Sequence, residues 1–133
     1  MSKSNSTEVD ILAKVFKATA LPWDAETDLN IHLHVGDPGE AGTSATSPAT
    51  YTSYAYVVVA RTGVAWSGTN PITNAALIQF PQCTGGTNTI THVSITPDGD
   101  TQILYSGALT ASLAVSNLIQ PQFGIGALSI SED

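Results

Sequence analysis

The sequence predicts a mainly β protein: a single antiparallel β-sandwich, jelly-roll-like, preceded by one short N-terminal helix. Two observations lead to this fold class. Beyond about residue 28, apolar residues alternate with polar ones or form short runs, and Gly, Pro, Asn and Asp separate these runs with no helical pattern between them. Only the start of the chain has the 3.6-residue period of an amphipathic helix. A length of 133 residues fits one compact domain, which we divide into a helical arm (1–22) and a β-sandwich domain (23–133).

The predicted helix covers residues 7–20. Thr7 is placed to cap it, acidic side chains follow in the first turn, and Pro22 ends it. An apolar stripe runs along one face, and two basic side chains lie near the C-terminal end; these residues are Val9, Leu12 and Phe16, with Lys14 and Lys17. A helix this short is marginal by itself, so it needs a surface on which to dock. The pattern leaves open whether that surface belongs to its own domain or to a partner.

Eight strands are predicted in the rest of the chain, at residues 29–35, 54–61, 64–66, 76–80, 89–96, 102–109, 112–115 and 127–130. The first strand alternates cleanly, which places its apolar residues on one face and His32 and His34 on the other, a face expected to meet solvent. The loop that follows, residues 36–50, is rich in Gly, Pro, Ser and Thr and longer than a usual hairpin loop, which indicates a surface segment with a possible contact role.

Charge is scarce and unevenly placed. Asp, Glu, Lys and Arg make up 11% of the chain, and eleven acidic residues against four basic ones give a net charge of −7. Residues 1–17 carry +1 and the remainder −8. This balance argues against a nucleic-acid partner, which requires clustered Lys and Arg. No apolar stretch is long enough to span a membrane. The first residues lack the apolar segment of a secretory signal. The single Cys83 indicates a reducing compartment.

Few residues suggest chemistry. His32, His34 and His92 are the candidates for metal ligands, because the first two share a strand face, but no metal-binding motif surrounds them and polar surface residues are the favoured interpretation. No nucleophile motif is present. We therefore expect no enzyme activity, no catalytic residue, no cofactor and no metal. Tyr51, Tyr54 and Tyr56 gather near the long loop and are candidates for contact with a sugar or a protein.

Segments that run in order from about residue 30 to the end carry a family resemblance; they are 33–43, 54–61, 74–81, 84–86, 91–92, 104–110 and 126–133. Taken together they resemble a family of small tailed-bacteriophage virion proteins, often labelled tail fibre or structural protein. The resemblance implies a virion protein of β architecture with no catalytic residues to carry over. The family label leaves its position on the particle open.

Physical arguments favour one position. A fibre is usually long, with a trimeric shaft or repeats, and neither appears here. We expect a capsid cement or decoration protein, made in the bacterial host cytoplasm and placed on the outer capsid surface as a homotrimer. Its helical arm would bind the major capsid protein, and its acidic β-sandwich domain would face solvent. We expect no contact with a membrane. The alternative is a tail-associated fibre or a receptor- or glycan-binding module. Across the two hypotheses the contact residues are Val9, Leu12, Lys14, Phe16, Lys17, Tyr51, Tyr54 and Tyr56.

Overall fold

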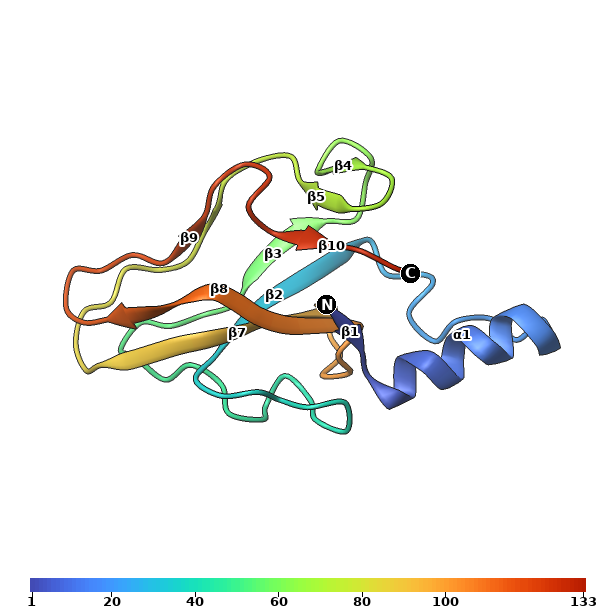
Figure 1. The fold of residues 1–133 in the computed structure, drawn as a ribbon, viewed down its shortest axis with the longest axis horizontal. Helices are drawn as coiled ribbons and strands as arrows, with labels where there is room; N and C mark the ends of the chain where they lie inside the picture. Colours follow the sequence, from blue (N-terminus) through green and yellow to red (C-terminus); the bar gives the residue numbers. More distant parts are fainter.

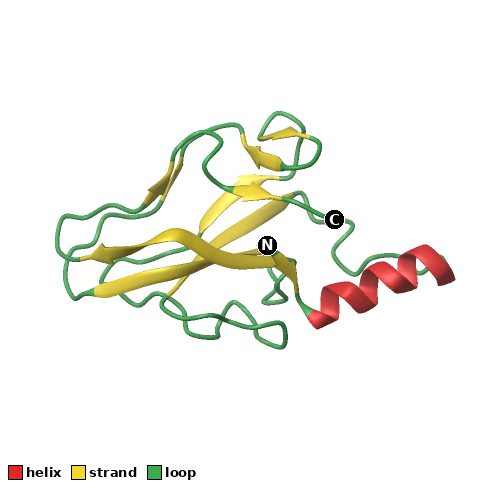
Figure 2. Cartoon of the chain, viewed as in Figure 1, coloured by secondary structure: helices red, strands yellow, loops and turns green.

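The computed structural model describes residues 1–133 as one helix and ten short strands in three antiparallel sheets (Figures 1 and 2). The main sheet has the strand order β1-β8-β7-β2-β3, with β1 (Ser2–Lys3), β8 (Tyr105–Val115), β7 (Asn88–Pro97), β2 (Asp28–His34) and β3 (Val57–Ala60). A three-stranded sheet has the order β10-β5-β4, with β10 (Ser129–Ile130), β5 (Ile72–Asn74) and β4 (Trp66–Gly68). A two-stranded ribbon pairs β6 (Ile78–Gln79) with β9 (Gln122–Phe123). The predicted fold class, mainly β with a short N-terminal helix, is confirmed.

The hydrophobic core lies between the five-stranded sheet and the short strands, which Figure 1 shows on one side of it. Alternation along β2 and β7 directs their apolar residues to this core, where they meet residues of the covering segments. The central members are Ile31, Leu33, Val93, Ile95, Ile78, Phe80 and Leu128. Phe80 is fully buried and packs edge-on against Phe123, with 6.2 Å between the ring centroids, so β9 is held to the core by an aromatic pair.

The polar face of β2 is not on the solvent side, contrary to the sequence-based expectation. His34 is fully buried, as are Ser94 and Thr96 of β7, which lie opposite His32 and Asn30. The segment 35–56 encloses this face. The Ala49 N–H bonds to the Leu33 carbonyl of β2, and the Val35 N–H, just after β2, bonds to the Ser47 carbonyl, at 2.9 Å each. The loop composition indicated a surface segment but carried no information about which sheet face it would cover.

The helix α1 (Asn5–Lys17) begins and ends earlier than predicted. Ser4, not Thr7, is the N-cap, and its hydroxyl accepts a hydrogen bond from the Thr7 backbone N–H. The helix ends because Ala18 adopts a left-handed conformation with φ of 53°, four residues before Pro22. Thr7 is buried at the base of the helix, so its hydroxyl has a tertiary partner and no capping role.

Several strand boundaries also differ from the prediction. The two strands predicted at 102–109 and 112–115 are one strand, β8, with no break at the intervening Thr110 and Ala111. The strand predicted at 54–61 is reduced to β3, because a turn closed by the Tyr54 N–H and the Tyr51 carbonyl precedes it. Strands β1, β5 and β9 were not predicted, since two or three residues are too few to show a period.

Candidate functional site

The helix α1 projects from the body and touches it only near its first turn (Figure 1). The Thr7 hydroxyl donates to the Ile103 carbonyl at 2.9 Å, and the Gln102 amide donates to the Asp10 carboxylate at 2.8 Å. The Asn5 backbone N–H donates to the Glu40 carbonyl at 2.9 Å. These contacts fix the start of the helix on the body and leave its later turns in solvent.

The apolar stripe predicted from the sequence lies on the outward face of α1. Val9 is 65% exposed, Leu12 57% and Phe16 79%. Helical spacing puts these three on one side, and puts Thr7 and Asp10, which bond to the body, on the other. The stripe therefore does not dock on its own domain. A contiguous row of large exposed apolar side chains is typical of a contact surface.

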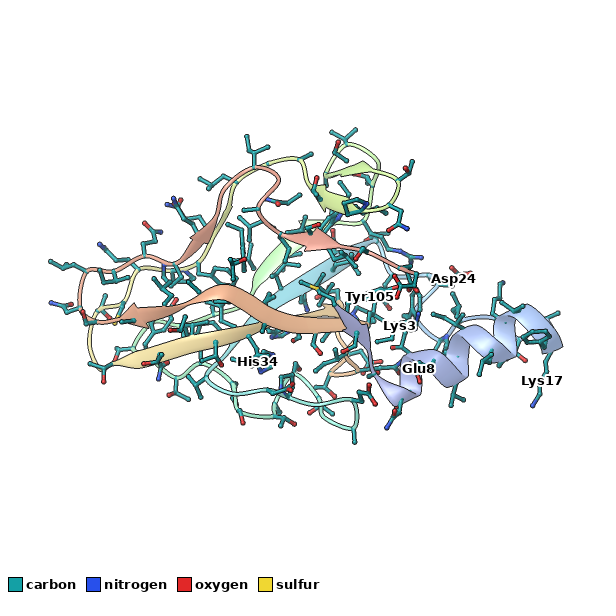
Figure 3. The ribbon with its side chains drawn as sticks, viewed as in Figure 1. Lys3, Glu8, Lys17, Asp24, His34 and Tyr105 are labelled. Atoms are coloured by element: carbon teal, nitrogen blue, oxygen red, sulfur yellow. The ribbon has the colours of Figure 1, made fainter.

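The two basic side chains near the C-terminal end of α1 form no ion pair. The two ion pairs of the structure join Lys3 to Glu132 at 2.6 Å and Arg61 to Asp24 at 3.6 Å, so Lys14 and Lys17 have no ion-pair partner. Lys17 lies at the far tip of the helix, as Figure 3 shows. The exposed surface of α1 thus combines an apolar stripe with two unpaired positive charges.

Charge is scarce in the second half of the chain. Between residues 62 and 131 the chain has only two charged side chains, Asp98 and Asp100. Both belong to the turn after β7, where the Asp98 N–H bonds to the Asp28 carbonyl at 3.2 Å. The opposite end of the molecule, formed by the turns before β7 and after β8, carries no charge (Figure 1). Its last turn exposes 69% of Leu118 and 39% of Ile119.

The three candidate tyrosines do not form one surface cluster. Tyr51 is 3% exposed, and its hydroxyl donates to the Pro81 carbonyl at 2.8 Å. Tyr54 packs edge-on against Tyr51 at 5.3 Å, and its hydroxyl accepts from the Leu33 N–H at 2.9 Å. Burial raises the pKa of both phenols, that of Tyr51 to about 12. Tyr51 is therefore a core residue, and only Tyr56, at 48% exposed, offers a ring to solvent.

The histidines are built into the body. The His34 ring donates from Nδ1 to the Thr46 carbonyl at 2.8 Å, so its Nε2 accepts from the Ser94 hydroxyl at 2.7 Å. His32 bonds through Nε2 to the Thr96 hydroxyl at 3.0 Å. Burial lowers the pKa of His32 to about 4, and it lowers the pKa of His34 as well. No group of three or more His, Cys, Asp and Glu side chains is placed to hold a metal ion.

A concavity of about 600 Å³ lies between the five-stranded sheet and the β4–β5–β10 sheet. We call it the Trp groove. Its apolar wall includes both tryptophans of the chain, and its main apolar members are Trp23, Leu29, Trp66, Ile72, Leu104 and Ile130. Arg61 and Glu132 also line it. The sequence did not predict this groove, because its wall combines residues that are far apart in the chain.

The two charged side chains that line the Trp groove, Arg61 and Glu132, are already bonded within the chain. The Arg61 guanidinium lies 5.4 Å over the Trp23 ring and donates to the Trp23 carbonyl at 3.2 Å. The Glu132 carboxylate pairs with Lys3 and also accepts from the Tyr105 hydroxyl, contacts that lower its pKa. The groove therefore presents mainly apolar surface to an incoming group.

Comparison with known proteins gives one family. The family model described as podophage GP4 fiber I protein gp80 matches residues 2–131. No curated protein matches the chain. The single helix has neither the length nor the apolar character needed to cross a bilayer. The matched residues include α1 and all three sheets.

Proposed function

The chain belongs to the podophage GP4 fiber I protein family of phage virion structural proteins, and we propose that its role in the virion is that of a capsid cement protein. On this proposal many copies bind the outer surface of the major capsid protein shell and hold neighbouring subunits together. The role is structural and requires no catalytic group. It requires surfaces that become buried when the protein joins the particle.

The observation that carries the proposal is the presence of two exposed apolar surfaces at opposite ends of the molecule. One is the stripe of α1, with Phe16 79% exposed, and the other is the uncharged end that presents Leu118 at 69% exposed. Apolar and uncharged surfaces cost little to remove from water. A protein that links its neighbours needs contact surfaces on two sides, and this chain offers them.

Cement action follows from mass action. A protein that binds the assembled shell, and not its separated subunits, stabilises the shell by a free energy that grows with the logarithm of its concentration over its Kd. A modest affinity at each site is sufficient when many sites are filled.

A second candidate is a tail-associated fibre or a receptor- or glycan-binding module, which the word "fiber" in the family description favours. On this alternative the long loop and the exposed ring of Tyr56 would meet the host surface, since burial removes Tyr51 from any such contact. The two candidates differ in location and in number of copies.

Cryo-electron microscopy of the phage particle, combined with quantitative mass spectrometry of the chain against the major capsid protein, tests the proposal. Density over the shell and hundreds of copies per particle would support the cement role. Density confined to the tail, with a handful of copies, would overturn it and favour the second candidate.

A further inference from the structure

We propose that the free edge of β8 pairs with the same edge of a second copy, so that two five-stranded sheets join into one continuous antiparallel sheet. The contact involves Gly107–Val115, which we call the β8 edge. It does not depend on the role or the position of the protein in the virion, so it goes beyond the proposed function. Its product is a two-fold dimer, in place of the homotrimer expected from the sequence.

The β8 edge is not paired on its outer side with any strand of its own chain. β8 lies between β7 and β1, but β1 pairs only with Tyr105 and Ser106, at one end of β8 (Figure 1). None of the backbone hydrogen bonds formed outside the helix and the paired strands involves a residue of the β8 edge. Unpaired N–H and C=O groups along the edge of a sheet are a template for another strand.

The middle of the β8 edge also lacks regular pairing on the side of β7. β8 has four residues, Leu109–Ser112, where β7 has only Thr91. This bulge leaves most of the backbone groups of the four residues without a partner in β7. Thr110, Ala111 and Ser112 are exposed to solvent. A second strand laid along this stretch would therefore satisfy backbone groups that the chain itself leaves unpaired.

The sequence of the β8 edge points to a second copy as the partner. The run Gly-Ala-Leu-Thr-Ala-Ser-Leu-Ala-Val reads almost the same in both directions from its centre, Ala111. An antiparallel pair with a two-fold axis at Ala111 places Leu109 of one copy opposite Leu113 of the other. In the same register Thr110 meets Ser112. Residues directly opposite on neighbouring strands share a sheet face and interact, so the edge complements itself in size and polarity.

The two leucines of the β8 edge gain burial in this arrangement. Leu109 and Leu113 are only partly buried, although they pack against the core. They line a concavity of about 500 Å³ between β8 and the segment 122–129, whose other apolar members include Met1 and Phe123. A second copy paired along β8 would place its own leucines beside this concavity and remove apolar surface of both copies from water.

The β8 edge lacks the side chains that most often prevent strands from pairing. It contains no charged residue and no proline. In a two-fold contact a charge near the axis lies close to its own copy and repels it, so this dimer requires an uncharged edge. β1 sets the limit of the contact, since Ser2 already lies opposite Ser106, the residue before Gly107.

The test places charge at the two-fold axis. A111K and A111E each put one charged side chain at an exposed position, and in the proposed dimer that side chain lies opposite its own copy. V64K is the matched control, because Val64 is 89% exposed and lies outside β8. Circular dichroism and a urea titration show whether each variant is folded.

Sedimentation equilibrium at micromolar concentration should show the native chain and V64K as dimers. A111K and A111E should each associate about ten-fold or more weakly, because like charges meet at the axis. An equal mixture of A111K and A111E should form a dimer again, since opposite charges then meet. Hydrogen exchange of the native chain should slow in residues 109–113 as the concentration is raised, and that of A111K should not.

A native chain that is monomeric at high micromolar concentration overturns the assignment of a second copy. So does a mixture that associates no better than either variant alone, because pairing centred on Ala111 requires the opposite charges to restore the dimer. Protection of residues 109–113 in the particle, but not in the isolated chain, would give the β8 edge to another virion protein and refute the second-copy contact. Failure of the cement role is read separately, from density and copy number on the particle, and leaves the measurement in solution unchanged.

Discussion

The partly buried His32 of β2 predicts a measurable sensitivity to acid. Burial lowers the pKa of His32 from 6.5 to about 4, and the neighbouring His34 adds to the effect. The unfolded chain keeps the ordinary pKa, so between these two values it binds more protons than the folded chain does. The contribution of His32 to stability is therefore complete above pH 6.5 and is lost as the pH falls toward about 4. A difference of two to three pKa units corresponds to about 3 kcal/mol.

The variant H32Q isolates this contribution, because a glutamine amide still bonds to the Thr96 hydroxyl but does not titrate. Urea unfolding of both proteins, followed from about pH 8 to about pH 4, gives the difference in unfolding free energy at each pH. Subtraction cancels the carboxylates, which both proteins share. We expect the advantage of the native chain over H32Q to fall by about 3 kcal/mol across this range. A difference that stays constant with pH would refute the reasoning that burial keeps His32 neutral.

Three further predictions concern individual side chains. F80A should cost about 3–5 kcal/mol in a urea titration, because Phe80 is fully buried in the core, whereas F16A should stay within about 0.5 kcal/mol of the native chain under conditions where the chain is monomeric. T7V removes the hydroxyl that bonds to the Ile103 carbonyl and should cost about 1–3 kcal/mol; hydrogen exchange should quicken in α1 and not in β7. Cys83 is fully buried, so a thiol reagent should modify it only after urea unfolds the protein.

The amphipathic character of α1 was readable from the sequence, but its destination was not. The period that aligns Val9, Leu12 and Phe16 is local, so it survives any tertiary arrangement. The direction of the helix depends on the bond from Thr7 to Ile103, residues 96 positions apart. Nothing in the sequence near Thr7 signals that bond. Pattern alone therefore predicted the apolar stripe and left open which surface it meets.

The strands show the same division between local and long-range information. Strands β2 and β7 were predicted because each alternates over six residues or more. Strands β5, β9 and β10 have two or three residues each, and their pairing depends on partners elsewhere, such as Thr73 opposite Ser129. The Trp groove lies against β5 and β10, so the part of the fold that builds it is the part that periodicity describes least.

The placement of the few charged residues bears on the proposed function, because it leaves one end of the molecule without charge. A protein with one uncharged apolar surface can bind only one neighbour through it, so the assembly ends at that contact. A protein with two such surfaces at opposite ends continues the assembly, and each added copy or subunit is held from both sides. This chain has Phe16 exposed at one end and Leu118 exposed at the other, and it carries only two charged side chains between residues 62 and 131. On the proposed cement role, the two uncharged apolar surfaces would provide the free energy of contact, because they cost little to remove from water.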